Sequence, residues 1–129
     1  MAKVTGIGGI FFKTKDPAQS RQWYREHLGV ESEEWGAIFK WRNFDNPDKK
    51  CYTVFSQFKE DTEYIKPSTL PFMINLRVDD LEALLEKLKE EGITQTGKTD
   101  VNDFGKFAWV IDPDGVKLEL WEPPANEIE

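Results

Sequence analysis

The chain has 129 residues, of which 39% are hydrophobic and 32% are charged, a balance that fits one soluble globular domain and argues against disorder. Its formal net charge of -7, without clustered Lys and Arg for phosphates, predicts no nucleic-acid partner. The longest apolar run, residues 7–12, is far too short to cross a bilayer, so we expect no membrane partner.

Targeting and redox signals favour the cytoplasm. The first residues, MAKVTG, lead directly into the first predicted strand without a signal-peptide pattern. Cys51 is the single cysteine, so it has no internal disulfide partner and is compatible with a reducing compartment. We therefore expect a cytoplasmic protein.

The first predicted strand lies in IGGIFFKT, residues 7–14. Ile10 and Phe12 alternate with Phe11 and Lys13, and a period of two turns these two sets to opposite faces of a sheet. We expect the first set to face a helix and the second to face away from it.

The first predicted helix follows in DPAQSRQWYREHLG. Asp16 is placed to cap its amino end, Pro17 suits the first helical position, and Gly29 suits a left-handed end. His27, the single histidine, lies in the last turn, where a cation favours the helix dipole. A surface or capping role is therefore the expectation for His27.

Two more strands are predicted around Phe39-Lys40-Trp41 and in CYTVFSQF, with the turn NPDKK between them. The polar residues 59–70, which hold a proline and end before another, are typical of a linker.

The second half opens with FMINLRVDD. Here Ile74, Leu76 and Val78 are apolar and should pack under a helix. That helix begins at a capping residue, Asp80, and ends at Gly92, with an apolar stripe of four leucines on one face. Three residues of the strand should face away from the helix: Met73, Asn75 and Arg77.

The two halves repeat the same order of signals. A capping Asp, a terminal Gly, a Phe-x-Trp triplet and a Pro-Asp turn recur, and DPDGVKLELWEP closes the second half. This order predicts two β-α-β-β-β modules, residues 4–58 and 71–123, within one domain of residues 1–129. A single ferredoxin-like sandwich whose halves match by chance is the alternative.

With its WYREHLGV helix end and its DPDGVKLELWEP close, the chain resembles the vicinal oxygen chelate superfamily, which includes glyoxalase I, extradiol dioxygenases and bleomycin resistance proteins. The resemblance implies an α+β fold in which two βαβββ modules form an incomplete barrel around a cavity. It also implies a small organic molecule as the ligand and a homodimer as the assembly.

In that superfamily, enzymes hold a divalent metal with one side chain from the first and one from the last strand of each module. Carried onto this sequence, the resemblance places these ligands at Gly9, Thr53, Met73 and Glu119, with Cys51 or Phe55 as alternatives to Thr53. Glycine has no side chain and a thioether is a soft ligand, so we predict no metal and no cofactor.

Strand parity brings the remaining candidates together. In the closing strand, Leu118 and Leu120 should pack under a helix, which turns Glu119 and Trp121 into the cavity. We expect Arg77 to approach Glu119 there. Glu119 is the candidate catalytic residue, and the ligand-binding candidates are Phe11, Lys13, Met73, Asn75, Arg77 and Trp121.

Three functions remain open from the sequence. The first is a metal-independent binding protein of the resistance type. The second is a lyase or isomerase of the glyoxalase class that uses a divalent metal, and the third is an enzyme that uses Glu119 as a base without metal. The missing metal ligands count against the second function. Nothing in the sequence separates the first from the third, because fold does not fix function.

Overall fold

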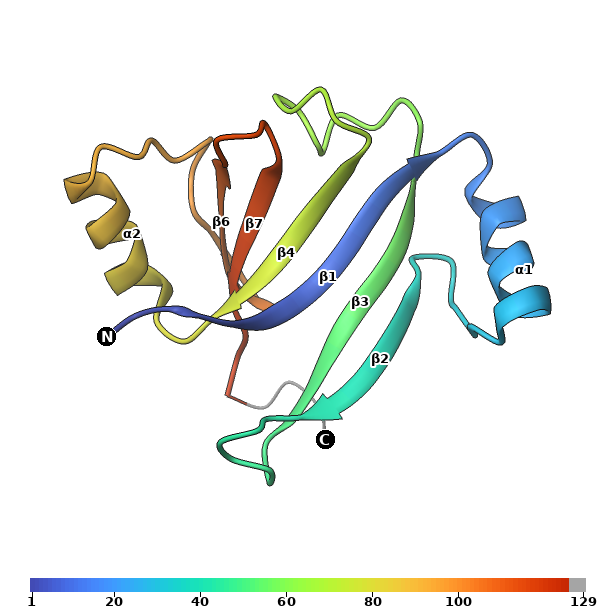
Figure 1. Ribbon diagram of the computed structural model, residues 1–129, viewed down its shortest axis with the longest axis horizontal. Helices are drawn as coiled ribbons and strands as arrows, with labels where there is room; N and C mark the ends of the chain where they lie inside the picture. Colours follow the sequence, from blue (N-terminus) through green and yellow to red (C-terminus); the bar gives the residue numbers. More distant parts are fainter. Residues whose placement is uncertain (126–129) are drawn as a thin grey trace.

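A curved sheet of seven strands runs diagonally between two helices that lie at its opposite ends (Figure 1). The computed structural model describes residues 1–125. The elements in chain order are β1 (Val4–Thr14), α1 (Pro17–Leu28), β2 (Ala37–Arg42), β3 (Lys50–Lys59), β4 (Phe72–Val78), α2 (Leu81–Glu90), β5 (Asp100–Asn102), β6 (Gly105–Ile111) and β7 (Lys117–Glu122).

Both helices begin at the aspartates that the sequence indicates. An Asp16 side-chain oxygen accepts the Gln19 amide at 3.0 Å, and Asp80 accepts the Ala83 amide at 3.1 Å. These bonds satisfy amides that have no partner inside the helix. α1 ends at Gly29, whose φ of 70° lies in the left-handed region that glycine adopts without strain.

The two halves join through the middle of the sheet. The strand order is β2-β3-β1-β4-β7-β6-β5, and the central pair β1 and β4 is antiparallel. Within each half, the first strand pairs with the last in parallel: β1 with β3, and β4 with β7. The sheet ends at β2 and β5, so it does not close into a barrel, and the predicted α+β fold with an incomplete barrel is confirmed.

The first module departs from the expected pattern in one respect. In the first module only β2 and β3 follow α1, whereas β5, β6 and β7 follow α2 in the second. An isolated bridge between Glu33 and Gly36 stands where the extra strand would lie. The preceding segment, ESEEW, is acidic and largely exposed, so it offers no alternating apolar face for a strand.

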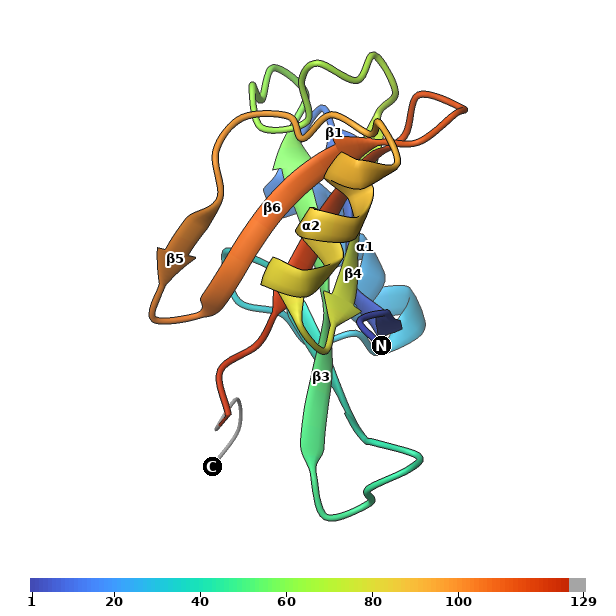
Figure 2. The same cartoon turned by 90° about the vertical axis from the view of Figure 1, so that its left-hand side faces the viewer.

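Under α2 lies the apolar core of the second module. Leu81 and Leu84 of the helix are buried there, and Figure 2 shows α2 lying across the β6 and β7 side of the sheet. The parity prediction for β4 and β7 is confirmed on this face, because Val78 and Leu120 are core residues with Leu118 packed against them. The buried set comprises Val78, Leu81, Leu84, Ala108, Val110 and Leu120.

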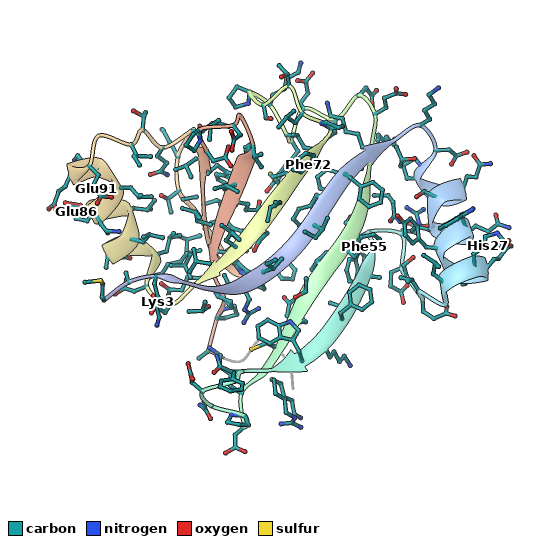
Figure 3. The ribbon with its side chains drawn as sticks, in the orientation of Figure 1. Lys3, His27, Phe55, Phe72, Glu86 and Glu91 are labelled. Carbon is teal, nitrogen blue, oxygen red and sulfur yellow. The ribbon has the colours of Figure 1, made fainter. Side chains whose placement is uncertain are left out.

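α1 is held differently, by aromatic contacts. None of its residues is buried, and Tyr24 contacts the rings of Phe12 and Phe55 at centroid distances of 6.2 and 5.2 Å. His27 is exposed, lies against Trp23 at 5.2 Å, and points away from the sheet in Figure 3. Neither described helix is long and apolar enough to cross a membrane.

Candidate functional site

A cavity of about 650 Å³ opens on the face of the sheet that the helices leave free. Its position follows from strand alternation: Phe12 and Leu118 turn toward the helices, while Phe11 and Glu119 line the cavity. Both modules contribute to the walls. The lining comprises Gly8, Phe11, Trp35, Ile38, Lys40, Tyr52, Val54, Asn75, Phe104, Phe107, Glu119 and Trp121.

Glu119 lies at the floor of this cavity and is only 4% exposed. The Asn75 amide donates to Oε1 at 2.8 Å, and the Trp109 indole donates to Oε2 at 3.0 Å. The Tyr64 hydroxyl donates to the same Oε2. Three donors therefore stabilise the ionised carboxylate, which offsets the cost of burying its charge.

Tyr64 reaches Glu119 from the segment between the modules. Burial and the nearby negative charge of Glu119 raise the pKa of Tyr64 far above its ordinary value. The phenol thus stays protonated at neutral pH and remains a donor. The segment that the sequence predicts as a linker is consequently part of the site.

Lys117 fixes that segment in place. Its Nζ donates to the carbonyls of Tyr64 at 2.6 Å and Lys66 at 2.9 Å, and lies 5.3 and 5.7 Å from the ring centroids of Tyr64 and Trp109. Burial lowers the pKa of Lys117, and the charge of Glu119 opposes this shift. Ser68 adds a further tie by donating to the Gly115 carbonyl at 2.6 Å.

Arg77 supports the aromatic wall. It is 3% exposed, and its guanidinium lies 5.1 Å from the Trp41 ring and 5.0 Å from the Trp121 ring. It also donates to the Tyr52 carbonyl at 3.1 Å. We expected the guanidinium to approach Glu119, but its described contacts place it between two tryptophans.

Two glycines at a β-bulge in β1 make room for the floor. A Cβ on Gly8 would lie 2.2 Å from Asn75 Oδ1 and 2.8 Å from Trp121, and one on Gly9 would lie 2.8 Å from Phe11. No side chain fits at either position without displacement. Asn75 is 3% exposed, and its Oδ1 has no hydrogen-bond partner within residues 1–125.

The expected metal-ligand positions do not converge. Gly9 has no room for a ligating side chain, and Met73 is fully buried in register with Lys117, two pairs along the strands from Glu119. Thr53 faces away from the cavity: it accepts from the Trp41 indole at 2.8 Å and donates to the Ile7 carbonyl.

The placement of Thr53 opposite Glu119 is thus off by one residue. The cavity-facing residues of β3 are Tyr52 and Val54, because strand alternation sends Thr53 to the other face. Nor do residues 1–125 contain any group of three or more His, Cys, Asp or Glu that could hold a metal ion. The donor set does not fit a divalent metal.

Four of the predicted site residues meet at the cavity, namely Phe11, Asn75, Glu119 and Trp121. Trp121 is 3% exposed, stacks on Phe107 at 6.0 Å, and donates to a backbone carbonyl. Met73 and Arg77 lie beneath the lining rather than in it. Lys13 lies at the end of β1 near the linker, where its backbone amide bonds to the Pro71 carbonyl.

Sequence reasoning missed three residues of the Glu119 network: Tyr64, Trp109 and Lys117. Trp109 and Lys117 follow from register, because Trp109 pairs with Glu119 across β6 and β7. For Tyr64, the available signal was the apolar pair Tyr64-Ile65 inside a polar linker, and Ile65 is in fact fully buried.

Comparison with known proteins places the fold. The protein-family model described as Glyoxalase/Bleomycin resistance protein/Dioxygenase superfamily matches residues 6–120. No curated protein matches the chain. Similar solved structures include a single-residue variant of methylmalonyl-CoA epimerase from Streptomyces coelicolor in complex with 2-nitronate-propionyl-CoA, at a TM-score of 0.68 and 19% identity, covering 98% of this chain and 100% of that one.

Two further structures show the same likeness. Methylmalonyl-CoA epimerase from Mycobacterium tuberculosis has a TM-score of 0.57 and 18% identity, covering 94% of this chain and 89% of that one. The Mn(II)-bound glyoxalase from Novosphingobium aromaticivorans has a TM-score of 0.62 and 19% identity, covering 95% of this chain and 40% of that one. At such identities the likeness establishes the fold alone.

Proposed function

We propose, for a chain that belongs to the Glyoxalase/Bleomycin resistance protein/Dioxygenase superfamily, that it is a metal-independent binding protein for a small organic molecule held in the cavity between its modules. The observation that supports this most is the hydrogen bonding of Glu119 and Asn75 at the base of the cavity. Every described bond to Glu119 comes from a protein donor, while Asn75 Oδ1 beside it is buried without a partner in the described chain. A buried acceptor without a partner favours a ligand that brings a donor.

The lining defines the chemistry of the ligand. Aromatic and aliphatic side chains such as Trp35, Phe107 and Trp121 form most of the walls, and Lys40 is the cation among them. A cavity of this make-up suits a flat apolar body with few polar groups. The expected ligand is thus an aromatic molecule with a hydroxyl or amine directed at Asn75.

The residues present at the expected metal-ligand positions support a site without metal. A divalent ion needs several hard or borderline ligands, and Glu119 is the one carboxylate in the described cavity lining. Its oxygens already accept three hydrogen bonds. A Glu119→Gln change should therefore leave metal content unaffected, because no bound metal depends on it.

Binding can be tested with 2-naphthol and its methyl ether, which lacks the donor. Because Trp35 and Trp121 line the cavity, 2-naphthol should quench tryptophan fluorescence with saturation, and a chelator should not alter the curve. The methyl ether should bind about tenfold more weakly, the cost of leaving one buried acceptor unpaired.

Variants then locate the probe. Glu119→Ala and Asn75→Ala should each weaken 2-naphthol, since one removes the carboxylate that orients the amide and the other removes the acceptor. Arg25→Ala, an exposed change on α1, is the control and should bind normally. Absence of saturable quenching, or quenching lost with chelator and restored by Mn²⁺, contradicts the proposal.

Proton abstraction by Glu119 is the second candidate, favoured by one observation: the carboxylate lines the cavity although it is 4% exposed. A direct test is exchange of the C2 hydrogen of methylmalonyl-CoA in D₂O, the compound named for several structural neighbours. Exchange that exceeds the spontaneous rate and is lost in Glu119→Gln would favour catalysis. Exchange equal to the spontaneous rate leaves binding as the function.

The assembly we propose is a cytoplasmic homodimer of two-module chains, with modules at residues 4–58 and 71–123 joined by residues 59–70. Apolar side chains on the central strand β1 support a second copy, since Val4 is 43% exposed and Ile7 is 50% exposed. Light scattering should give about twice the chain mass of 15.0 kDa. A single-chain mass over a wide concentration range contradicts the dimer.

A further inference from the structure

A second cavity, distinct from the one between the modules, lies where the start of α1 meets the end of β3 and the linker. Its volume is about 610 Å³. In Figure 1 these three segments come together at the upper right of the molecule. Phe58 and Tyr64 give it an aromatic wall, and Pro17 and Ala18 add the apolar side of the helix.

Gln57 is the feature that points to a ligand there. It lines this cavity, is only 7% exposed, and has an Oε1 without a hydrogen-bond partner within residues 1–125. Buried polar atoms are nearly always paired, and one that is not calls for an explanation. A ligand with a hydroxyl or amino group would supply the missing donor.

Charged groups around the rim define the rest of the ligand. Arg21 and Lys59 line the cavity, and neither forms an ion pair with any residue of 1–125. Two such cations favour an anionic group, and arginine in particular suits a carboxylate. The lining carboxylates are Asp16, which caps α1, together with Glu34 and Asp61, and these favour a donor rather than a second anion.

We propose that this cavity is a second ligand site, for a small organic acid that carries a hydroxyl or amino group next to its carboxylate. The carboxylate lies toward Arg21 and Lys59, the donor bonds to Gln57 Oε1, and an apolar side group rests on Phe58. The two linings share no residue, and the one described hydrogen bond that joins them runs from Tyr64 of this cavity to Glu119 of the other.

Three matched probes test the proposal on the wild-type chain: L-phenylalanine, 3-phenyllactate and 3-phenylpropionate. They share a carboxylate and a ring, and only the last lacks the donor. We expect the amino or the hydroxy acid to bind with a dissociation constant of about 1 mM, as befits a few polar contacts. In NMR titrations it should shift the amide signals of Ala18 and Lys59, and 3-phenylpropionate should bind about tenfold more weakly.

The first two probes distinguish the source of the donor. Tighter binding of L-phenylalanine assigns the site to amino acids, because the nearby carboxylates then hold the ammonium group. Tighter binding of 3-phenyllactate assigns it to hydroxy acids.

Variants assign the contacts. Gln57→Leu keeps the volume and removes the acceptor, so it should abolish the preference for the probes with a donor. Arg21→Ala should weaken all three probes about fivefold. Arg25→Ala, one turn further along α1 and outside the lining, should change nothing.

Two results overturn the proposal. One is equal binding of 3-phenyllactate, L-phenylalanine and 3-phenylpropionate to the wild-type chain, which removes the role of Gln57 even if its variant does not fold. The other is no shift at Ala18 and Lys59 at about ten times the expected constant. Shifts confined to Asn75 and Trp121 count as the same failure, because they report the cavity between the modules.

Discussion

The two modules follow the same chain path apart from the strand that the first lacks, and they contribute different groups to the site. The second module carries the charged floor, where Glu119 and Asn75 bond to each other, and it packs α2 on a buried apolar core. The first module supplies half of the aromatic lining and a glycine, Gly8, that leaves room for Asn75 and Trp121, and its helix buries no residue. The polar groups that bond to each other at the base of the cavity, Asn75 and Glu119, therefore both belong to the second module.

The two modules also differ in the hydrogen-bond donors that they provide to the buried Glu119 carboxylate. A buried carboxylate needs donors, and those of Glu119 come from β4, β6 and the linker. The first module contributes none of these described bonds, and its strand β1 carries glycines and a bulge, with Gly9 at a position where the family resemblance predicts a metal ligand.

The largest expected effect concerns how tightly the two helices pack on the sheet. Leu81, in the first turn of α2, is fully buried, so Leu81→Ala should lower the free energy of unfolding by about 2–5 kcal/mol through lost burial and a cavity. Leu28→Ala on α1 is the matched control, because Leu28 is 59% exposed, and should cost less than about 1 kcal/mol. Urea denaturation measures both. Equal losses would show that the two helices are held alike.

A second prediction concerns the charged floor. Glu119→Gln removes the negative charge from the group that accepts from Asn75, Tyr64 and Trp109 and replaces one of its oxygens by an NH2 group, so the charge-assisted bonds are weakened. The expected loss of unfolding free energy is about 2–3 kcal/mol. Glu86→Gln, on the outer face of α2 (Figure 3), should stay within about 0.5 kcal/mol. A Glu119 variant as stable as the Glu86 variant contradicts the network.

The fold could be predicted from the sequence more completely than the contacts within the site. The capping aspartates and strand parity are local signals, and they placed Glu119, Asn75 and Trp121 correctly. The bulge at Gly8 and the register of β3 depend on pairing between distant strands, which a period of two cannot reveal. Tyr64 escaped for the same reason, because its role exists only once the linker folds over β7.

The third prediction tests the space that the first module provides. Gly8→Ala sets a Cβ against Asn75 Oδ1 and Trp121, so it should cost about 1–3 kcal/mol by overpacking and should weaken 2-naphthol. Gly6→Ala is the matched change in the same strand, because its Cβ would meet a Trp41 ring atom at a milder 3.3 Å. Thermal unfolding and fluorescence quenching of the two variants give the comparison. Similar behaviour of both would show that the space at Gly8 is not required.

The smallest effect concerns Lys117 and pH. Burial lowers the pKa of Lys117 in the folded chain, whereas the unfolded value is about 10.5. Between those values the unfolded chain binds more protons, so the free energy of unfolding rises with pH, by at most about 1.4 kcal/mol per pH unit. The raised pKa of Tyr64 has the opposite sign and acts only above about pH 10, so urea denaturation is best followed from pH 7 to about pH 10. Lys117→Met should remove the rise, while Lys89→Met, on the exposed side of α2, should keep it. If both variants follow the wild-type pH curve, the ammonium of Lys117 is not desolvated.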